Sequence, residues 1–244
     1  MKRSANKISE HERLEEVSKW FSTATPGFDN RLTIYSALSL KKYFHGSSVL
    51  EVGSADGQMT GMLIDHFSRV EAVEGSRTYY DKLKKKYNNS LILHHSLIED
   101  FEIEEKFDTI LLAHILEHLK SPISVLKRVS KWLETNGRII IAVPNANSIH
   151  RLVAVKMGIL GSPDQYSDRD IKLGHRRVYT LEKLSADIHS AGLTISETGG
   201  IFFKPLTNKQ IDETFTEEMM DGFYKIGNDF PEYAAEIFAI CQKK

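Results

Sequence analysis

The chain has 244 residues and a formal net charge of −1, with 41% hydrophobic and 27% charged residues. These values suit one soluble α/β domain with additions and count against a general nucleic-acid-binding protein. The single cysteine, Cys241, excludes an internal disulfide and indicates a reducing, cytoplasmic compartment. No apolar run is long enough to cross a bilayer, and the basic residues 1–6 precede no apolar segment. Neither a membrane span nor a secretory signal is therefore expected.

Apolar residues recur at helical spacing in the first part of the chain and predict helices over 8–21 and 30–43. After these helices, short apolar runs of strand type alternate with amphipathic helical segments. Strands are predicted over 47–52, 70–73, 91–94, 107–113 and 138–143, and helices over 58–66, 77–87 and 123–133. This alternation predicts an α/β fold built on a parallel, doubly wound sheet.

The remainder of the chain is less regular in its pattern. Two further helices are predicted over 148–157 and 181–191, with a loop-like stretch over 158–174 between them. A strand is predicted over 194–201. An acidic amphipathic helix is predicted over 208–224. The apolar run 235–241 is predicted as a last strand, although the same residues also fit a helix.

A turn of small residues lies between the first strand and the helix after it. Glu51 belongs to the strand, and Gly53, Ala55 and Gly57 belong to the turn. Glycines let the backbone approach a ligand closely, and the next helix N-terminus offers free N–H groups. A nicotinamide site requires G-x-G-x-x-G, which this turn does not match. Because Glu51 would repel a phosphate, the turn predicts a nucleotide-like ligand without a pyrophosphate.

This turn resembles the first motif of class I S-adenosylmethionine-dependent methyltransferases, an acidic residue followed by G-x-G-x-G, with Ala55 at the middle glycine. The resemblance covers about residues 45–200 and implies a Rossmann-like, doubly wound, mostly parallel seven-stranded sheet. It implies S-adenosylmethionine as the cofactor, with Glu74 accepting the ribose hydroxyls and the residues after the third strand holding adenine. The residues that it assigns to the cofactor are Glu51, Gly53, Ala55, Gly57, Glu74, Ser96, Leu97 and Ala113.

The same resemblance predicts one methyltransferase domain over 1–244. Its parts are an N-terminal helical cap over 1–45, a cofactor-binding core over 46–200 and acceptor-side lid segments over 145–180 and 201–232. The expected partner is a small-molecule methyl acceptor, and the expected product of the donor is S-adenosylhomocysteine.

His114, Glu117 and His118 follow the fourth strand in an H-x-x-E-H pattern. Ligands bind beyond the carboxyl ends of parallel strands, so these residues are expected at the methyl acceptor. The pattern also matches an inverted zinc-peptidase motif, but that motif needs both histidines on a helix, and here a strand leads directly into it. Three roles are open: the residues support the loop under the cofactor, His114 or His118 is a general base, or the cluster binds a divalent cation that lowers the acceptor's pKa.

The cation site would combine Glu117 and His118 with His175, and it resembles the site of magnesium-dependent relatives. Those relatives include small-RNA 2′-O-methyltransferases and ubiquinone-pathway O-methyltransferases. Their first position is acidic, whereas His114 here favours a softer metal. The catalytic candidates are thus His114, Glu117, His118 and His175.

The predicted function is methyl transfer from S-adenosylmethionine to an oxygen or nitrogen of a small polar metabolite, such as a sugar, a quinone-like compound or a natural-product intermediate. One alternative is a metal-assisted RNA-end 2′-O-methyltransferase, which the near-zero net charge counts against. Another is a non-catalytic module that keeps only the fold, which the intact turn counts against. Arg151, Arg176 and Arg177 are expected to hold an acidic group of the acceptor or to pair with the acids over 208–224.

Overall fold

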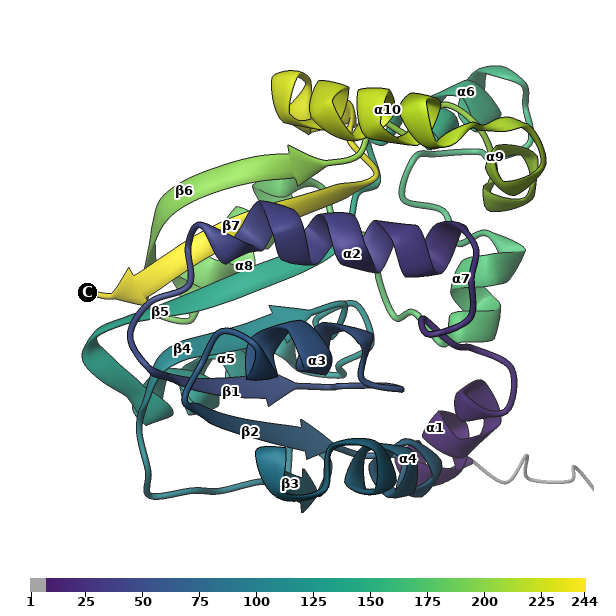
Figure 1. Ribbon diagram of the computed structural model, residues 1–244. Coiled ribbons are helices and arrows are strands. Elements are labelled where there is room, and N and C mark those ends of the chain that lie inside the picture. Colours follow the sequence, from purple (N-terminus) through teal and green to yellow (C-terminus); the bar gives the residue numbers. More distant parts are fainter. Residues whose placement is uncertain (1–7) are drawn as a thin grey trace, which may run out of the picture.

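A computed structural model describes residues 8–244 and shows a seven-stranded sheet with helices on both faces (Figure 1). The strand order is β3-β2-β1-β4-β5-β7-β6, in which the first five strands are parallel and β7 runs antiparallel to both of its neighbours. The predicted doubly wound, mostly parallel sheet is therefore confirmed. The strands are β1 (Ser48–Val52), β2 (Arg69–Glu74), β3 (Ile92–His95), β4 (Phe107–Ala113), β5 (Leu133–Pro144), β6 (Leu193–Ile201) and β7 (Glu236–Lys243).

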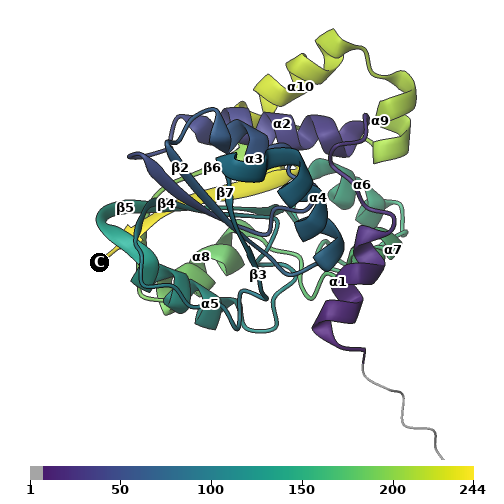
Figure 2. The same ribbon diagram turned by 60° about the horizontal axis from the view of Figure 1, so that its bottom comes forward.

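Helices pack on both faces of this sheet in a three-layer arrangement, and the helices over Glu10–Ser18 and Asp168–Leu173 lie beyond the ends of the parallel strands (Figures 1 and 2). Side chains alternate between the faces along each strand, so Ile139 and Ile141 join one core cluster and Ile140 and Ala142 join the other. Both faces are buried, which explains the near-continuous apolar character of the central strands. The helices are α1 (Glu10–Ser18), α2 (Phe28–Lys41), α3 (Gln58–Ile64), α4 (Arg77–Tyr87), α5 (Pro122–Val129), α6 (Ile149–Lys156), α7 (Asp168–Leu173), α8 (Leu181–Ser190), α9 (Asn208–Thr214) and α10 (Glu217–Asp229).

Three predicted elements differ clearly from the structure, in their type, their number or the residue at which they end. The stretch over 158–174, expected as a loop, contains α7, which begins at a capping box between Ser167 and Asp170 and ends at the left-handed Gly174. The single helix expected over 208–224 is two helices, because Thr216 accepts the N–H of Met219 and starts α10. The helix expected over 123–133 ends at Val129, and β5 already begins at Leu133.

The last strand, predicted over 235–241, is β7, and in the sheet it lies between β5 and β6. Because β7 is antiparallel, its first residue, Glu236, pairs with Pro144 at the carboxyl end of β5. The start of β7 therefore reaches the edge of the sheet at which the parallel strands end. Within residues 8–244, no helix is both long enough and apolar enough to cross a membrane. The basic residues 1–6 lie outside the described part of the chain.

Candidate active site

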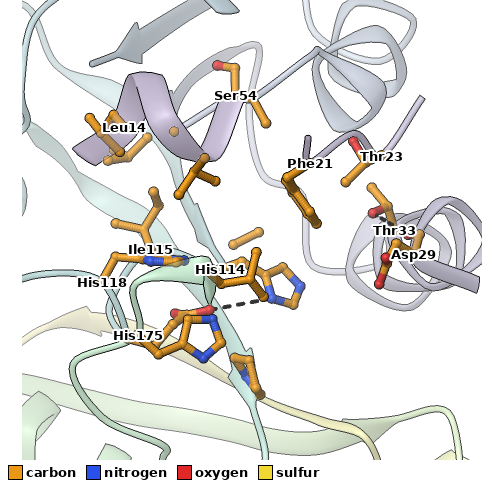
Figure 3. A pocket seen from close by; sticks show the side chains of 18 of the residues that line it. Leu14, Phe21, Thr23, Asp29, Thr33, Ser54, His114, Ile115, His118 and His175 are labelled. Carbon is orange, nitrogen blue, oxygen red and sulfur yellow. Dashed lines mark hydrogen bonds and ion pairs between the residues drawn. The ribbon is translucent and has the colours of Figure 1, made fainter. Parts of the chain in front are cut away.

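A cavity of about 350 Å³ lies at the carboxyl ends of β1, β2, β4 and β5. Its volume falls in the range of small-molecule sites. Figure 3 shows His114, His118 and His175 on one side of the cavity, with Phe21, Thr23, Thr33 and Asp29 on the other. The structure brings most of the predicted site residues to this one cavity, namely Glu51, Gly53, Ala55, Glu74, Ser96, Leu97, Ala113, His114, Glu117, His118 and His175.

Gly57, the remaining predicted cofactor residue, does not line the cavity and precedes α3 in the left-handed conformation with φ of 84°. A Cβ there would lie 2.5 Å from Cδ2 of Leu83 and 2.8 Å from Cε2 of Tyr87. Gly53 has φ of 77°, and a Cβ on it would clash with Cδ1 of Ile115. Ala55 also has a positive φ, 45°, so the alanine adopts a conformation that favours glycine.

Glu74 holds the backbone of this turn. One carboxylate oxygen accepts the N–H groups of Ser54 and Ala55, each at 3.0 Å, and the other accepts the N–H of Ser76 at 2.7 Å. Burial raises the pKa of Glu74 to about 7, although these backbone donors lower it. The side chain expected at the ribose thus also orders the turn in front of it.

Glu51 is the second buried acid beside the glycine turn. Its Oε2 accepts the hydroxyl of Thr60 at 2.6 Å, and 2% of the residue is exposed. Burial raises the pKa of Glu51 to about 7, with the hydroxyls of Thr60 and Ser54 acting in the opposite direction and the Glu74 charge adding to the rise. Near neutral pH both acids are therefore poised between the neutral and charged forms.

Ser96 and Leu97 follow β3, as predicted, and the hydroxyl of Ser96 donates to the carbonyl of Leu97 at 2.9 Å. The N-terminal segment was predicted as a helical cap without these residues being named, and Leu14, Val17 and Phe21 line the cavity. The segment is anchored to the glycine turn, because Asp56 accepts the hydroxyls of Ser22 and Thr23 and the N–H of Ala24. No local motif marks these residues, since their apolar spacing fits any packed helix.

His114 lies between two buried carboxylates. Its Nε2 is 3.0 Å from Oε1 of Glu236, and its Nδ1 is 3.6 Å from Oε1 of Glu117. Burial lowers the pKa of His114, but the Glu236 and Glu117 carboxylates outweigh burial and raise it well above the usual value. Glu236 also accepts the hydroxyl of Ser36 at 2.6 Å. His114 is therefore an imidazolium whose N–H groups face two acids.

Glu117, His118 and His175 form a second group, in which one potential ligand atom from each residue lies within 4.8 Å of the others. Neither carboxylate oxygen of Glu117 has a hydrogen-bond partner among the described residues. Burial lowers the pKa of His118 to about 4, so its imidazole is neutral. His175 contacts the edge of His118, with ring centroids 4.8 Å apart, and its Nδ1 lies 2.9 Å from Oδ1 of Asp170.

The sequence model of the methyltransferase domain family matches residues 16–198. The chain belongs to this methyltransferase family. The predicted class I methyltransferase family and the prediction of an enzyme are thereby confirmed.

Similar proteins agree with this assignment. Over 124 residues, this methyltransferase is 26% identical to a ubiquinone biosynthesis O-methyltransferase of Aeromonas salmonicida, covering 48% of this chain and 50% of the relative. A ubiquinone biosynthesis O-methyltransferase of Rhodopseudomonas palustris is 24% identical over 174 residues, which cover 67% of this chain and 65% of the relative. The methyltransferase chain thus spans between half and two thirds of the length of these two relatives.

Solved structures share the fold of this methyltransferase. The CcbJ methyltransferase from Streptomyces caelestis superposes with a TM-score of 0.61 at 15% identity, covering 96% of this chain and 97% of that chain. The N-methyltransferase NodS from Bradyrhizobium japonicum, solved with S-adenosyl-L-homocysteine, has a TM-score of 0.59 at 16% identity, with coverage of 95% and 96%. At these identities the likeness concerns the fold.

Arg151, Arg176 and Arg177 do not pair with the acids over 208–224, which was one of the two roles expected of them. Arg151 binds Asp170 at 2.9 Å, and Arg176 binds Glu10 at 2.8 Å. Arg177 donates to the carbonyls of Leu116 and Leu119. These arginines hold the loop after β4 and the α6–α7 segment in place.

Glu236 and Asp170 contact the histidines of this site, and the sequence motifs missed both of them. Glu236 carries a weak signal, because it is an acid at the start of a mostly apolar strand. Asp170 carries only the signal of a capping residue. Neither signal indicates which histidine the acid contacts, since each contact joins segments that are packed together by the tertiary fold.

Proposed function

We propose that this enzyme transfers the methyl group of S-adenosylmethionine to an oxygen or nitrogen atom of a small polar acceptor. The observation that carries the proposal is that one cavity joins the glycine turn and its two acids to the cluster of His114, Glu117, His118 and His175. The donor end and the acceptor end of a methyl transfer require such a shared space, because the two reacting groups must lie in line.

At the donor end, the turn and the acids Glu51 and Glu74 suit S-adenosylmethionine. The donor carries an ammonium group and ribose hydroxyls, which are hydrogen-bond donors to carboxylates. Binding of a cationic donor would favour the charged forms of both acids, whose pKa values burial raises to about 7. Ser96 and Leu97 would hold the adenine.

At the acceptor end, the cavity wall carries polar groups from several elements. Asp29 and Thr33 come from α2, His150 from α6 and Asn208 from α9. Such a wall supports a small acceptor with several hydrogen-bonding groups. We also propose that the segment 1–45, of which 1–7 lie outside the described residues, caps the cavity, that 46–200 bind the donor, and that 145–180 and 201–232 close over the acceptor.

In the reaction, a lone pair of the acceptor attacks the methyl carbon while the carbon–sulfur bond breaks, and the electron pair stays on sulfur. The acceptor also loses a proton. His114 is unsuited to take this proton, because the flanking carboxylates keep it protonated. The group of Glu117, His118 and His175 is better placed for this role, since one potential ligand atom from each residue lies within 4.8 Å of the others.

Glu117, His118 and His175 also fit a divalent cation. Both Glu117 oxygens lack hydrogen-bond partners among the described residues, although the side chain is buried. One carboxylate and two imidazoles form a donor set that suits a borderline transition metal better than magnesium. A cation held there would lower the pKa of an acceptor hydroxyl.

Calorimetry tests the donor assignment. S-adenosylhomocysteine should bind the wild-type protein, and NAD should not. Tight NAD binding without S-adenosylhomocysteine binding would refute the proposal. Incubation with labelled S-adenosylmethionine and a metabolite extract then identifies the acceptor by the label that it gains.

The catalytic cluster is tested with the acceptor found in this way. His118→Asn should lower turnover while the affinity for S-adenosylhomocysteine stays near the wild-type value. His66→Asn, at an exposed histidine, is the matched control. Unchanged turnover in both His118→Asn and His175→Asn would reduce the cluster to a structural role.

A further inference from the structure

His175 is linked to two charged side chains outside the cavity cluster, and this link bears on the cluster that the proposed function uses. We infer that Arg151 and Asp170 are positioning residues that hold His175 in the tautomer with the proton on Nδ1. Its Nε2 then presents an electron pair to the centre that it shares with Glu117 and His118, where a divalent cation of the transition-metal type binds.

The contacts of Asp170 determine which group donates. Its Oδ2 accepts from Arg151 Nη1 at 2.9 Å, from the Ser167 N–H at 2.8 Å and from the Ser167 hydroxyl at 2.6 Å. The buried ion pair with Arg151, together with the two Ser167 donors on the same oxygen, stabilises the ionised carboxylate, which has no proton of its own to give. Asp170 Oδ1, 2.9 Å from Nδ1 of His175, must therefore accept a proton from that nitrogen.

A neutral imidazole carries one N–H, so a proton on Nδ1 leaves Nε2 with a free electron pair. Ligating histidines are commonly oriented by a carboxylate on the other ring nitrogen in this way. His175 and Asp170 have side chains that are only 5% and 8% exposed, so water does not compete freely for this bond. The rigid pairing gives the free electron pair a defined direction.

The surrounding backbone supports this arrangement. Arg151 is buried and also donates to the carbonyls of Pro163 and Gln165, so the segment before α7 folds around its guanidinium. The N–H of His175 donates to the carbonyl of Asp170 at 2.9 Å, and the N–H of Arg176 donates to the carbonyl of Glu117 at 2.7 Å. The segment that carries His175 is thereby attached directly to the loop that carries Glu117.

The variant Asp170→Asn tests whether Asp170 sets the tautomer of His175 or only packs against it. Arg151 and Ser167 offer only donors to Oδ2, so the amide oxygen of an asparagine would occupy that place. The amide NH₂ would then face Nδ1 of His175 and donate to it. The variant keeps the packing but moves the imidazole proton to Nε2, which removes the electron pair from the cluster.

The tautomer is measured by long-range ¹H–¹⁵N correlation spectra of protein labelled on histidine, assigned with His175→Asn. The wild type should show a proton on Nδ1, and Asp170→Asn a proton on Nε2. Zn²⁺ affinity, measured by calorimetry, should fall about 10- to 100-fold in Asp170→Asn. Asp168→Asn, at an exposed position on the same helix, is the control and should match the wild type.

A wild-type proton on Nε2 would overturn the inference, and this spectrum needs no variant to fold. An inverted tautomer with unchanged Zn²⁺ affinity, or a wild type that does not bind Zn²⁺, would also overturn it. The inference rests on the proposed function, and the two are separable. S-adenosylhomocysteine binding tests the donor site alone and should differ less than about twofold between wild type and Asp170→Asn.

Discussion

Glu51→Gln should make the ligand-free protein more stable at pH 8 than the wild type. Burial raises the pKa of Glu51 from 4.5 to about 7. Since this folded-state value lies above the unfolded one, the contribution of Glu51 to stability is fully present below about pH 4.5. It is lost as the pH rises through about 7, because the fold then holds a buried charge.

The size of the effect follows from that rise in pKa. At about 1.4 kcal/mol per pH unit, ionised Glu51 costs the folded state roughly 3 kcal/mol above pH 7. Glutamine has the shape of the neutral acid and carries no charge, so it avoids this cost. Its carbonyl would accept the Thr60 hydroxyl, as the carboxylate does.

Urea unfolding of both proteins without ligand, at pH 5 and pH 8, measures the difference. Glu51→Gln should gain up to about 3 kcal/mol in free energy of unfolding at pH 8 and much less at pH 5. Glu104→Gln, at an exposed acid, controls for the change in net charge. An equal shift at both pH values would refute the reasoning. The variant should nevertheless bind S-adenosylhomocysteine more weakly, because the proposed partner of the ammonium group has lost its charge.

Other outcomes follow from the turn and from the histidine cluster. Gly53→Ala should lower the free energy of unfolding by about 2–4 kcal/mol, because it combines a positive φ with a clash against Ile115. Gly158→Ala has a similar φ of 73° but open space around it, so thermal unfolding should show a loss of only about 1 kcal/mol; equal losses would contradict the clash. Wild-type stability should fall as the pH drops from about 6.5 toward 4, because the fold holds His118 neutral, and His118→Asn should weaken this dependence in acid unfolding curves.

The local sequence was sufficient to predict the order of the elements from β1 to β5 and the glycine turn after β1. The alternation of apolar runs and amphipathic segments predicted the order of strands and helices from β1 to β5, since periodicity reflects which face of an element is buried. The turn at Gly53 and Gly57 was recognisable because a positive φ leaves few residue types to choose from. Where local signals competed, as in the stretch that holds α7 and at the break before α10, capping residues outweighed the broader pattern.

The contacts of His114 and His175, in contrast, depend on the tertiary structure. Nothing in the H-x-x-E-H pattern shows that His114 lies against Glu236, because that contact requires β7 to enter the sheet antiparallel beside β5. Likewise, Asp170 meets His175 only once α7 has formed and Arg151 has been buried against it. The chemical state of a histidine depends on its neighbours within a few ångströms. Sequence spacing therefore predicted these histidines in one site, and only the packed fold decided which is charged and which offers an electron pair.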